Sequence, residues 1–128
     1  MIKRVIKIRS YWKVIVYFDI SYNFFHIIEN ELYKINCNKR TIREIYYNMY
    51  INKAKAVTIS NVQLHISIVL FNRHTYYYDY INSIIHEAEH IKQSMLYAYN
   101  IDDYGEPPAY TIGYLASLMI LKYNLYEK

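Results

Sequence analysis

The chain has 128 residues, a length that suits one domain with a sizeable core and excludes two. Apolar residues supply 54% and charged residues 20%, which excludes an intrinsically disordered chain. The net charge of +4 is uneven: residues 1–55 hold eleven Lys and Arg against four Asp and Glu, whereas residues 56–128 hold four against seven. A basic half suits an acidic partner or nucleic acid, but no nucleic-acid motif accompanies it.

The first half of the chain predicts a strand and two helices. The stretch 11–20 (YWKVIVYFDI) is rich in β-branched and aromatic residues and predicts a strand, which the alternation in 3–10 would begin earlier. In 21–36, apolar residues recur at helical spacing. A second helix is expected to begin at Thr41, because Glu44 three residues later completes a capping-box pattern.

The second half predicts two strands and then two helices. Residues 55–60 and 62–71 predict strands, the second of them with alternating apolar residues at its start. A long helical pattern follows from about Tyr80 to Tyr99. A loop with both prolines and one of the two glycines leads to a last helix over about 108–125.

These elements predict an α+β fold in which a small sheet packs against helices. No linker divides the sequence, so we expect a single domain over residues 1–128. Residues 1–55 form its basic strand–helix–helix half and residues 56–128 its strand–strand–helix–helix half. No signal peptide and no apolar run of about 20 residues is present, which predicts a soluble protein that is not secreted.

Residues 86–90 read HEAEH, one helical turn with a histidine at each end. Positions four apart on a helix lie side by side, so His86 and His90 can take two corners of a tetrahedral zinc ion. Glu87 lies beside the pair, where a carboxylate can accept a proton from water held by the metal. The motif therefore predicts a zinc site with Glu87 as general base.

Coincidence, burial in the core and plain solvent exposure are the alternatives to a metal site at these histidines. This composition gives about 0.01 HExxH matches by chance, which makes coincidence improbable. Helix phase places His86 and His90 nearly opposite the apolar face, so they are not expected in the core; two solvated surface histidines remain the alternative. That apolar face is expected to contain Ile81, Ile84, Ile85, Ala88, Ile91 and Met95.

A stable zinc site needs a third protein ligand. Glu106 stands at the N-terminal end of the last predicted helix. It would reach the histidines if that helix packs antiparallel against the HExxH helix. Its alternative role is to stabilise the helix N-terminus through the helix dipole. Asp103 is the reserve ligand.

Other polar and aromatic residues suit structural roles. His65 falls in a strand pattern and is expected to be a hydrogen-bonded structural residue, whereas His26 and His74 are expected at the surface. Trp12 is expected in the core. Cys37, the single cysteine, excludes an internal disulfide and is expected to be inert.

This arrangement resembles the zincin metallopeptidases, most of all the branch in which a glutamate on a following helix completes the HExxH site. The order of two strands, HExxH helix and Glu-bearing helix is similar to the minimal core of that fold. At finer grain, INSIIHEAEHIKQSM and DDYGEPPAYTIGYLASLMI resemble small HExxH proteins of tailed bacteriophages, including phages of gut Bacteroides. The resemblance covers roughly residues 56–121.

The resemblance implies zinc as cofactor, His86, His90 and Glu106 as its ligands, and Glu87 as general base. Pro107 directly follows Glu106, where the family usually continues a regular helix. The residue that would stabilise an oxyanion is not identified by any motif. Tyr110 is preferred among the candidates, which are Tyr104, Tyr110 and Tyr114.

Two functions follow as expectations. The first is a zinc-binding phage protein, a tail or neck component of the virion with a metallopeptidase-type site, whose partners are other virion proteins or copies of itself. The alternative is an active small zinc peptidase that cleaves peptides in the host cytoplasm and has no structural role. Binding of nucleic acid through the basic half ranks third. Whether the site turns over a substrate is left open by the sequence.

Overall fold

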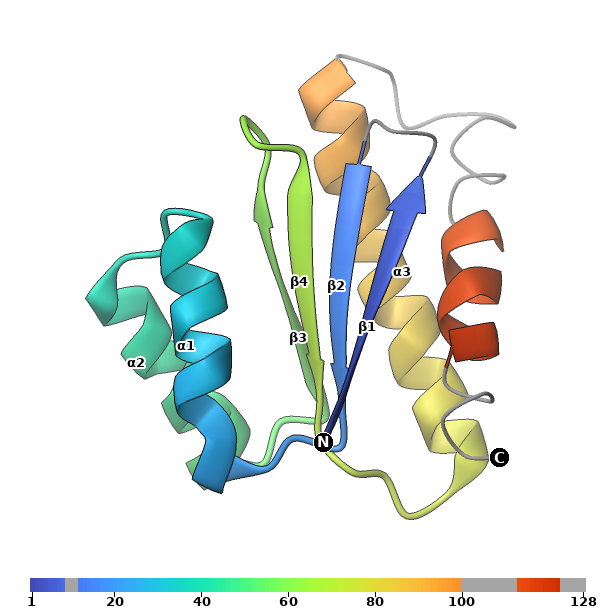
Figure 1. The fold of residues 1–128 in the computed structure, drawn as a ribbon. Helices are drawn as coiled ribbons and strands as arrows, with labels where there is room; N and C mark the ends of the chain where they lie inside the picture. Colours follow the sequence, from blue (N-terminus) through green and yellow to red (C-terminus); the bar gives the residue numbers. More distant parts are fainter. Residues whose placement is uncertain (9–11, 100–112, 123–128) are drawn as a thin grey trace.

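A four-stranded mixed sheet is the centre of the structure, a computed structural model that describes residues 1–8, 12–99 and 113–122 (Figure 1). Two antiparallel hairpins, β1–β2 and β3–β4, join through the parallel pair β2–β4 to give the order β1-β2-β4-β3. One sheet therefore contains strands from both the basic and the acidic half of the chain. The strands are β1 (Ile2–Ile8), β2 (Trp12–Phe18), β3 (Ala56–Asn61) and β4 (Ile66–Phe71).

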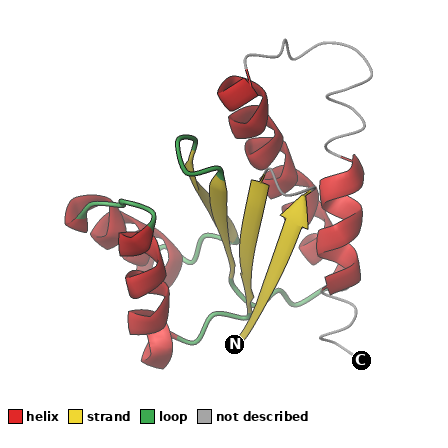
Figure 2. Ribbon diagram, turned by 45° about the horizontal axis from the view of Figure 1, so that its top comes forward, coloured by secondary structure: helices red, strands yellow, loops and turns green. Residues whose placement is uncertain are grey.

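Helices cover both faces of this sheet, as Figures 1 and 2 show. One face is covered by α1 (Phe25–Lys34), which follows a short 3-10 turn, and by α2 (Lys39–Tyr46), which continues as one π-helical turn to Ile51. The other face is covered by α3 (Tyr77–Tyr99) and by the helix of residues 113–122. The α+β class expected from the sequence is confirmed.

The central strand β2 explains the two cores. Its alternate side chains, such as Val14 and Val16, pack under α3, whereas Ile15 and Tyr17 pack under α1 and α2. A strand covered on both faces needs apolar residues at consecutive positions, which accounts for the unbroken run in WKVIVYF.

Two strand predictions are corrected. The strand expected over 11–20 is present as β2, but it does not begin in the preceding alternating stretch, which belongs to a separate strand, β1, paired antiparallel with it. β1 lies at the sheet edge and buries only Ile6 and Ile8. The strand expected over 62–71 begins only at Ile66. The Asn61 side chain accepts hydrogen bonds of 3.0 Å from the backbone N–H groups of Gln63 and Leu64, and these bonds stabilise a turn before the strand. His65 closes this turn in the left-handed conformation, with φ 55°, and is not a strand residue.

Two helix predictions are corrected as well. Asn38, and not Thr41, caps α2: its side chain accepts a hydrogen bond of 2.8 Å from the Thr41 backbone. Glu44 pairs instead with Arg40 at 3.4 Å. On α3, Ile85 is 45% exposed and lies outside the apolar face, whose buried members include Ile84 and Ala88.

The last predicted helix is seen in part, since residues 113–122 are helical and the rest of 108–125 lies outside the described residues. Leu115, Ala116 and Met119 of this helix join the core beneath α3. Among the helices that the structure describes, none is long and apolar enough to cross a membrane.

Candidate metal centre

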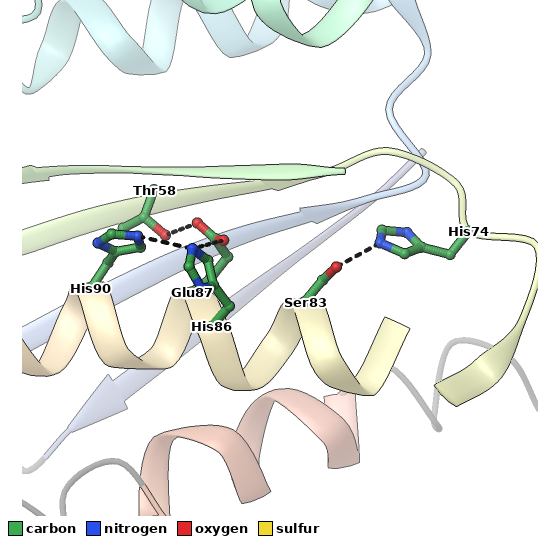
Figure 3. A network of polar contacts seen from close by, with 6 residues as sticks. All are labelled: Thr58, His74, Ser83, His86, Glu87 and His90. Atoms are coloured by element: carbon green, nitrogen blue, oxygen red, sulfur yellow. Dashed lines mark hydrogen bonds and ion pairs between the residues drawn. The ribbon is translucent and has the colours of Figure 1, made fainter. Parts of the chain in front are cut away.

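The two histidines of HEAEH project from the same side of α3. Because an α-helix turns once in 3.6 residues, His86 and His90 stand one turn apart and point the same way (Figure 3). Both side chains are exposed, whereas Ala88 and Ile91 of the same helix are fully buried beneath the sheet. Their place outside the core agrees with the helix phase read from the sequence.

The spacing of the two imidazoles fits a shared divalent ion. The Nε2 atoms of His86 and His90 lie 3.2 Å apart, with the ring planes at 83°. Two nitrogens that each bind a tetrahedral zinc at about 2.0–2.1 Å lie about 3.3–3.4 Å from one another. In the described part of the chain the two rings share a hydrogen bond of 3.2 Å, and their spacing matches that of two nitrogens on one zinc ion.

Glu87 points inward, between α3 and the sheet. It is only 4% exposed, and its Oε1 accepts a hydrogen bond of 2.9 Å from the Thr58 hydroxyl on β3 (Figure 3). Its Oε2 lies 4.0 Å from Nε2 of His86. One carboxylate oxygen is thus held by the sheet, and the other faces the nitrogen that would bind a metal.

Two hollows flank the histidine pair along the line where α3 passes β3. The first, of about 370 Å³, is lined by His86 and Glu87 together with polar residues of the first turns of α3. The second, of about 350 Å³, is lined by His90, by Thr58 and Ser60 of β3, and by later residues of α3. A molecule placed at the histidines would therefore find space on both sides.

The third ligand expected from the sequence cannot be placed. Glu106, its reserve Asp103 and the oxyanion candidate Tyr110 lie outside the described residues. Within residues 1–8, 12–99 and 113–122, no group of three or more His, Cys, Asp or Glu side chains is arranged to hold a metal ion. The third ligand stays a prediction.

His74 is not the surface residue that the sequence suggested. It is half-buried in the segment between β4 and α3, where its Nδ1 lies 2.7 Å from the Asn72 carbonyl oxygen and its Nε2 lies 2.8 Å from the Ser83 hydroxyl. Burial lowers the pKa of His74. No sequence pattern pointed to this contact, because nine residues separate His74 from Ser83.

Most of the remaining residues have the roles expected of them. Trp12 is buried, and its indole donates a hydrogen bond of 3.0 Å to the Ser67 hydroxyl. His65 stacks on the Trp12 ring, with ring centroids 5.3 Å apart, which is a structural role. His26 is exposed as expected. Burial raises the pKa of the Cys37 thiol, which keeps it in the unreactive protonated form.

Thr58 is the residue of this site that the motif did not predict. A signal existed in the alternation of β3: Ala56 packs with the core beneath α3, whereas Val57 and Ile59 pack with the core beneath α1 and α2. Thr58 shares the α3 side with Ala56, so a polar side chain at that position had to meet α3.

Comparison of the chain with protein-family models, with curated proteins and with solved structures gave no match.

Proposed function

We propose that the protein binds zinc through His86 and His90 and that the centre is of the metallopeptidase type, with Glu87 as general base. The observation that carries the proposal is the separation of 3.2 Å between the two Nε2 atoms, next to a buried carboxylate that a sheet residue holds in place. Glu106 is proposed as the third ligand on the strength of the zincin resemblance.

The buried carboxylate supports a catalytic centre over an ion that only ties segments together. Burial of an ionised carboxylate is unfavourable unless the charge is compensated, and an ion with a purely structural role makes no demand for a carboxylate at this position. The structure retains Glu87 there with a hydroxyl donor from Thr58. To take a proton from water at the metal, a base must be held close to the two ligands without binding the metal itself, and Glu87 has such a position.

The chemistry divides between the ion and the chain. A bound zinc ion supplies a Lewis acid that makes water more acidic and polarises a carbonyl group. Glu87 accepts the proton of the attacking water through Oε2, the oxygen that faces His86, while Thr58 holds Oε1. The same carboxyl group then returns the proton to the leaving amine, so the base is restored after each peptide bond is cleaved.

We propose further that the protein works in or on a phage particle. This part rests on the resemblance of the HExxH and Glu106 regions to small phage proteins. Mass spectrometry of purified particles tests it: peptides of this chain at a constant ratio to the major structural proteins are expected, and their absence would overturn the virion role.

The test of the centre is metal analysis of the purified chain together with a peptide-cleavage assay. We expect about one zinc per chain, with loss of zinc in His86→Ala and in His90→Ala. His26→Ala is the matched control, because it removes an exposed histidine on α1 and should leave the zinc content unchanged. Zinc content in the His86 and His90 variants equal to that of the parent chain would overturn the proposal. Zinc binding without cleavage of a broad peptide library would show that the ion has only a structural role and that the centre is not catalytic.

A further inference from the structure

A second chain of polar contacts lies one turn before the histidine pair. The Ser83 hydroxyl of α3 lies 2.8 Å from Nε2 of His74 (Figure 3). Nδ1 of His74 lies 2.7 Å from the Asn72 carbonyl oxygen. A carbonyl oxygen only accepts hydrogen bonds, so Nδ1 must carry the proton. In a neutral ring Nε2 is then the acceptor, and the serine hydroxyl donates to it.

The imidazole and the carbonyl that orients it are both fixed. The Asn72 side chain donates hydrogen bonds of 2.9 Å and 2.7 Å to the carbonyl oxygens of Met49 and Ala54 and accepts one from the Tyr22 hydroxyl. The Tyr80 ring stacks on His74, with centroids 4.3 Å apart. Burial lowers the pKa of His74, which favours the neutral ring that can accept a proton.

Ser83 also lines a hollow beside α3. This is the hollow of about 370 Å³ whose wall includes Lys55, Asp79 and Asn82, and which also reaches His86 and Glu87 of the candidate metal centre. The serine is only 8% exposed, so it forms a buried part of the wall of this hollow. A nucleophile, a neutral base within hydrogen-bond distance and a group that orients the base are the three parts of an activated serine.

We propose that Ser83 is a nucleophile activated by His74 and that this pair forms a second reactive site, which takes the acyl group of small esters. In the first step, Ser83 Oγ bonds to the acyl carbon, the hydroxyl proton passes to Nε2 of His74, and the ester C–O bond breaks as the leaving alcohol takes that proton. In the second step, water attacks the acyl-serine, its proton passes to His74 and then to Ser83 Oγ, and the carboxylic acid is released. No oxidant, metal or co-reactant other than water is needed.

The lining of the hollow sets the substrate class. Its volume admits a short acyl group rather than a folded partner. Asn82 and Lys55 are the hydrogen-bond donors of the wall available to a developing oxyanion, and Lys55 lies 3.5 Å from Asp79. Because Asp79 and Glu87 place two carboxylates in the wall against one lysine, the substrate is a small, uncharged ester.

The experiment uses a fluorophosphonate probe on the full chain in the presence of EDTA, which separates this site from the metal centre. In the labelling reaction Ser83 Oγ bonds to phosphorus, fluoride leaves, and the proton passes through His74 to solvent. We expect about one probe per chain, placed on Ser83 by peptide mapping, and no labelling of Ser83→Ala. His74→Gln should slow labelling on the order of 100-fold, the usual contribution of a general base.

Ser94→Ala is the matched control, because it removes a serine of the same helix that lines the second hollow, and it should label like the parent chain. Circular dichroism of each variant checks the fold, and the mapping of the parent adduct needs no variant at all. Absence of an adduct on Ser83, or equal rates in the parent chain and His74→Gln, would overturn the proposal. Loss of labelling with EDTA would also overturn it, since the step uses no metal.

Discussion

Thr58 and Glu87 face each other across the space between β3 and α3, and the threonine hydroxyl donates a hydrogen bond of 2.9 Å to the buried carboxylate. The contact joins residues that are 29 positions apart in the chain. It makes the outer strand of the sheet part of the candidate centre, because the orientation of the carboxylate depends on where β3 lies against α3.

Removal of the Thr58 hydroxyl is expected to destabilise the fold. Thr58→Val keeps the shape of the side chain but leaves a buried carboxylate oxygen without its donor, and such a loss lowers the free energy of unfolding by about 1–3 kcal/mol. Thr58→Ser restores a hydroxyl and should recover most of this difference. Urea unfolding of the three proteins measures it; equal stability of the valine and threonine forms would mean that the hydrogen bond has no net effect.

Glu87→Gln separates zinc binding from proton transfer. The carboxamide oxygen can still accept the Thr58 hydrogen bond, and neither histidine ligand is touched, so zinc content should be unchanged. Since a carboxamide cannot accept a proton at neutral pH, cleavage of a peptide substrate should fall on the order of 100-fold or more. Activity that survives this substitution at the parent rate would show that Glu87 is not the general base.

His74 should make the fold less stable at mildly acidic pH. Burial is the main cause that lowers the pKa of His74 in the folded chain, with a further lowering by Lys55 and opposing effects of the Asn72 carbonyl, Asp79 and Asp19. The unfolded chain then binds a proton more readily than the folded chain. The contribution of His74 is complete above its ordinary pKa of 6.5 and is lost as pH falls from there through the lowered pKa.

The measurement is urea unfolding at pH 7.5 and at pH 5.5. The parent chain should lose more stability between the two values than His74→Gln, which has no imidazole to titrate. His26→Gln, which changes an exposed histidine on α1, serves as the matched control and should behave like the parent chain. The same pH dependence in the parent chain and in His74→Gln would contradict the assignment.

The sequence predicted the features that depend on local periodicity and residue type. The α+β class, the helical turn that pairs His86 with His90, and the burial of Trp12 follow from periodicity and residue type, and the structure agrees on each. Periodicity could not separate β1 from β2, because only residues 9–11 stand between them in the sequence and apolar residues continue on both sides. It also misplaced His65, since the Asn61 turn interrupts the alternation without a glycine or proline to mark it.

Contacts between distant segments account for what the sequence did not predict. Glu87 was expected beside the histidine pair, but its burial depends on β3, and the partner Thr58 is set by strand register. The link from His74 to Ser83 depends on how the segment after β4 folds against the first turns of α3. Such pairs have no fixed spacing in the sequence, so no sequence motif predicts them.

The third zinc ligand can be identified by comparing the substitution of two acidic residues, Glu106 and Asp103. Zinc held by two imidazoles alone is weakly bound, and a third protein donor is what gives such a site its affinity. If Glu106 supplies that donor, Glu106→Ala should weaken zinc binding on the order of 100-fold in a titration with a competing chelator, a loss at least as large as that of an outer-shell partner. Asp103→Ala is the matched control, three residues earlier, and should bind zinc like the parent chain. The opposite order of the two affinities would transfer the ligand role to Asp103, and unchanged affinity in both variants would remove the zincin-type ligand set altogether.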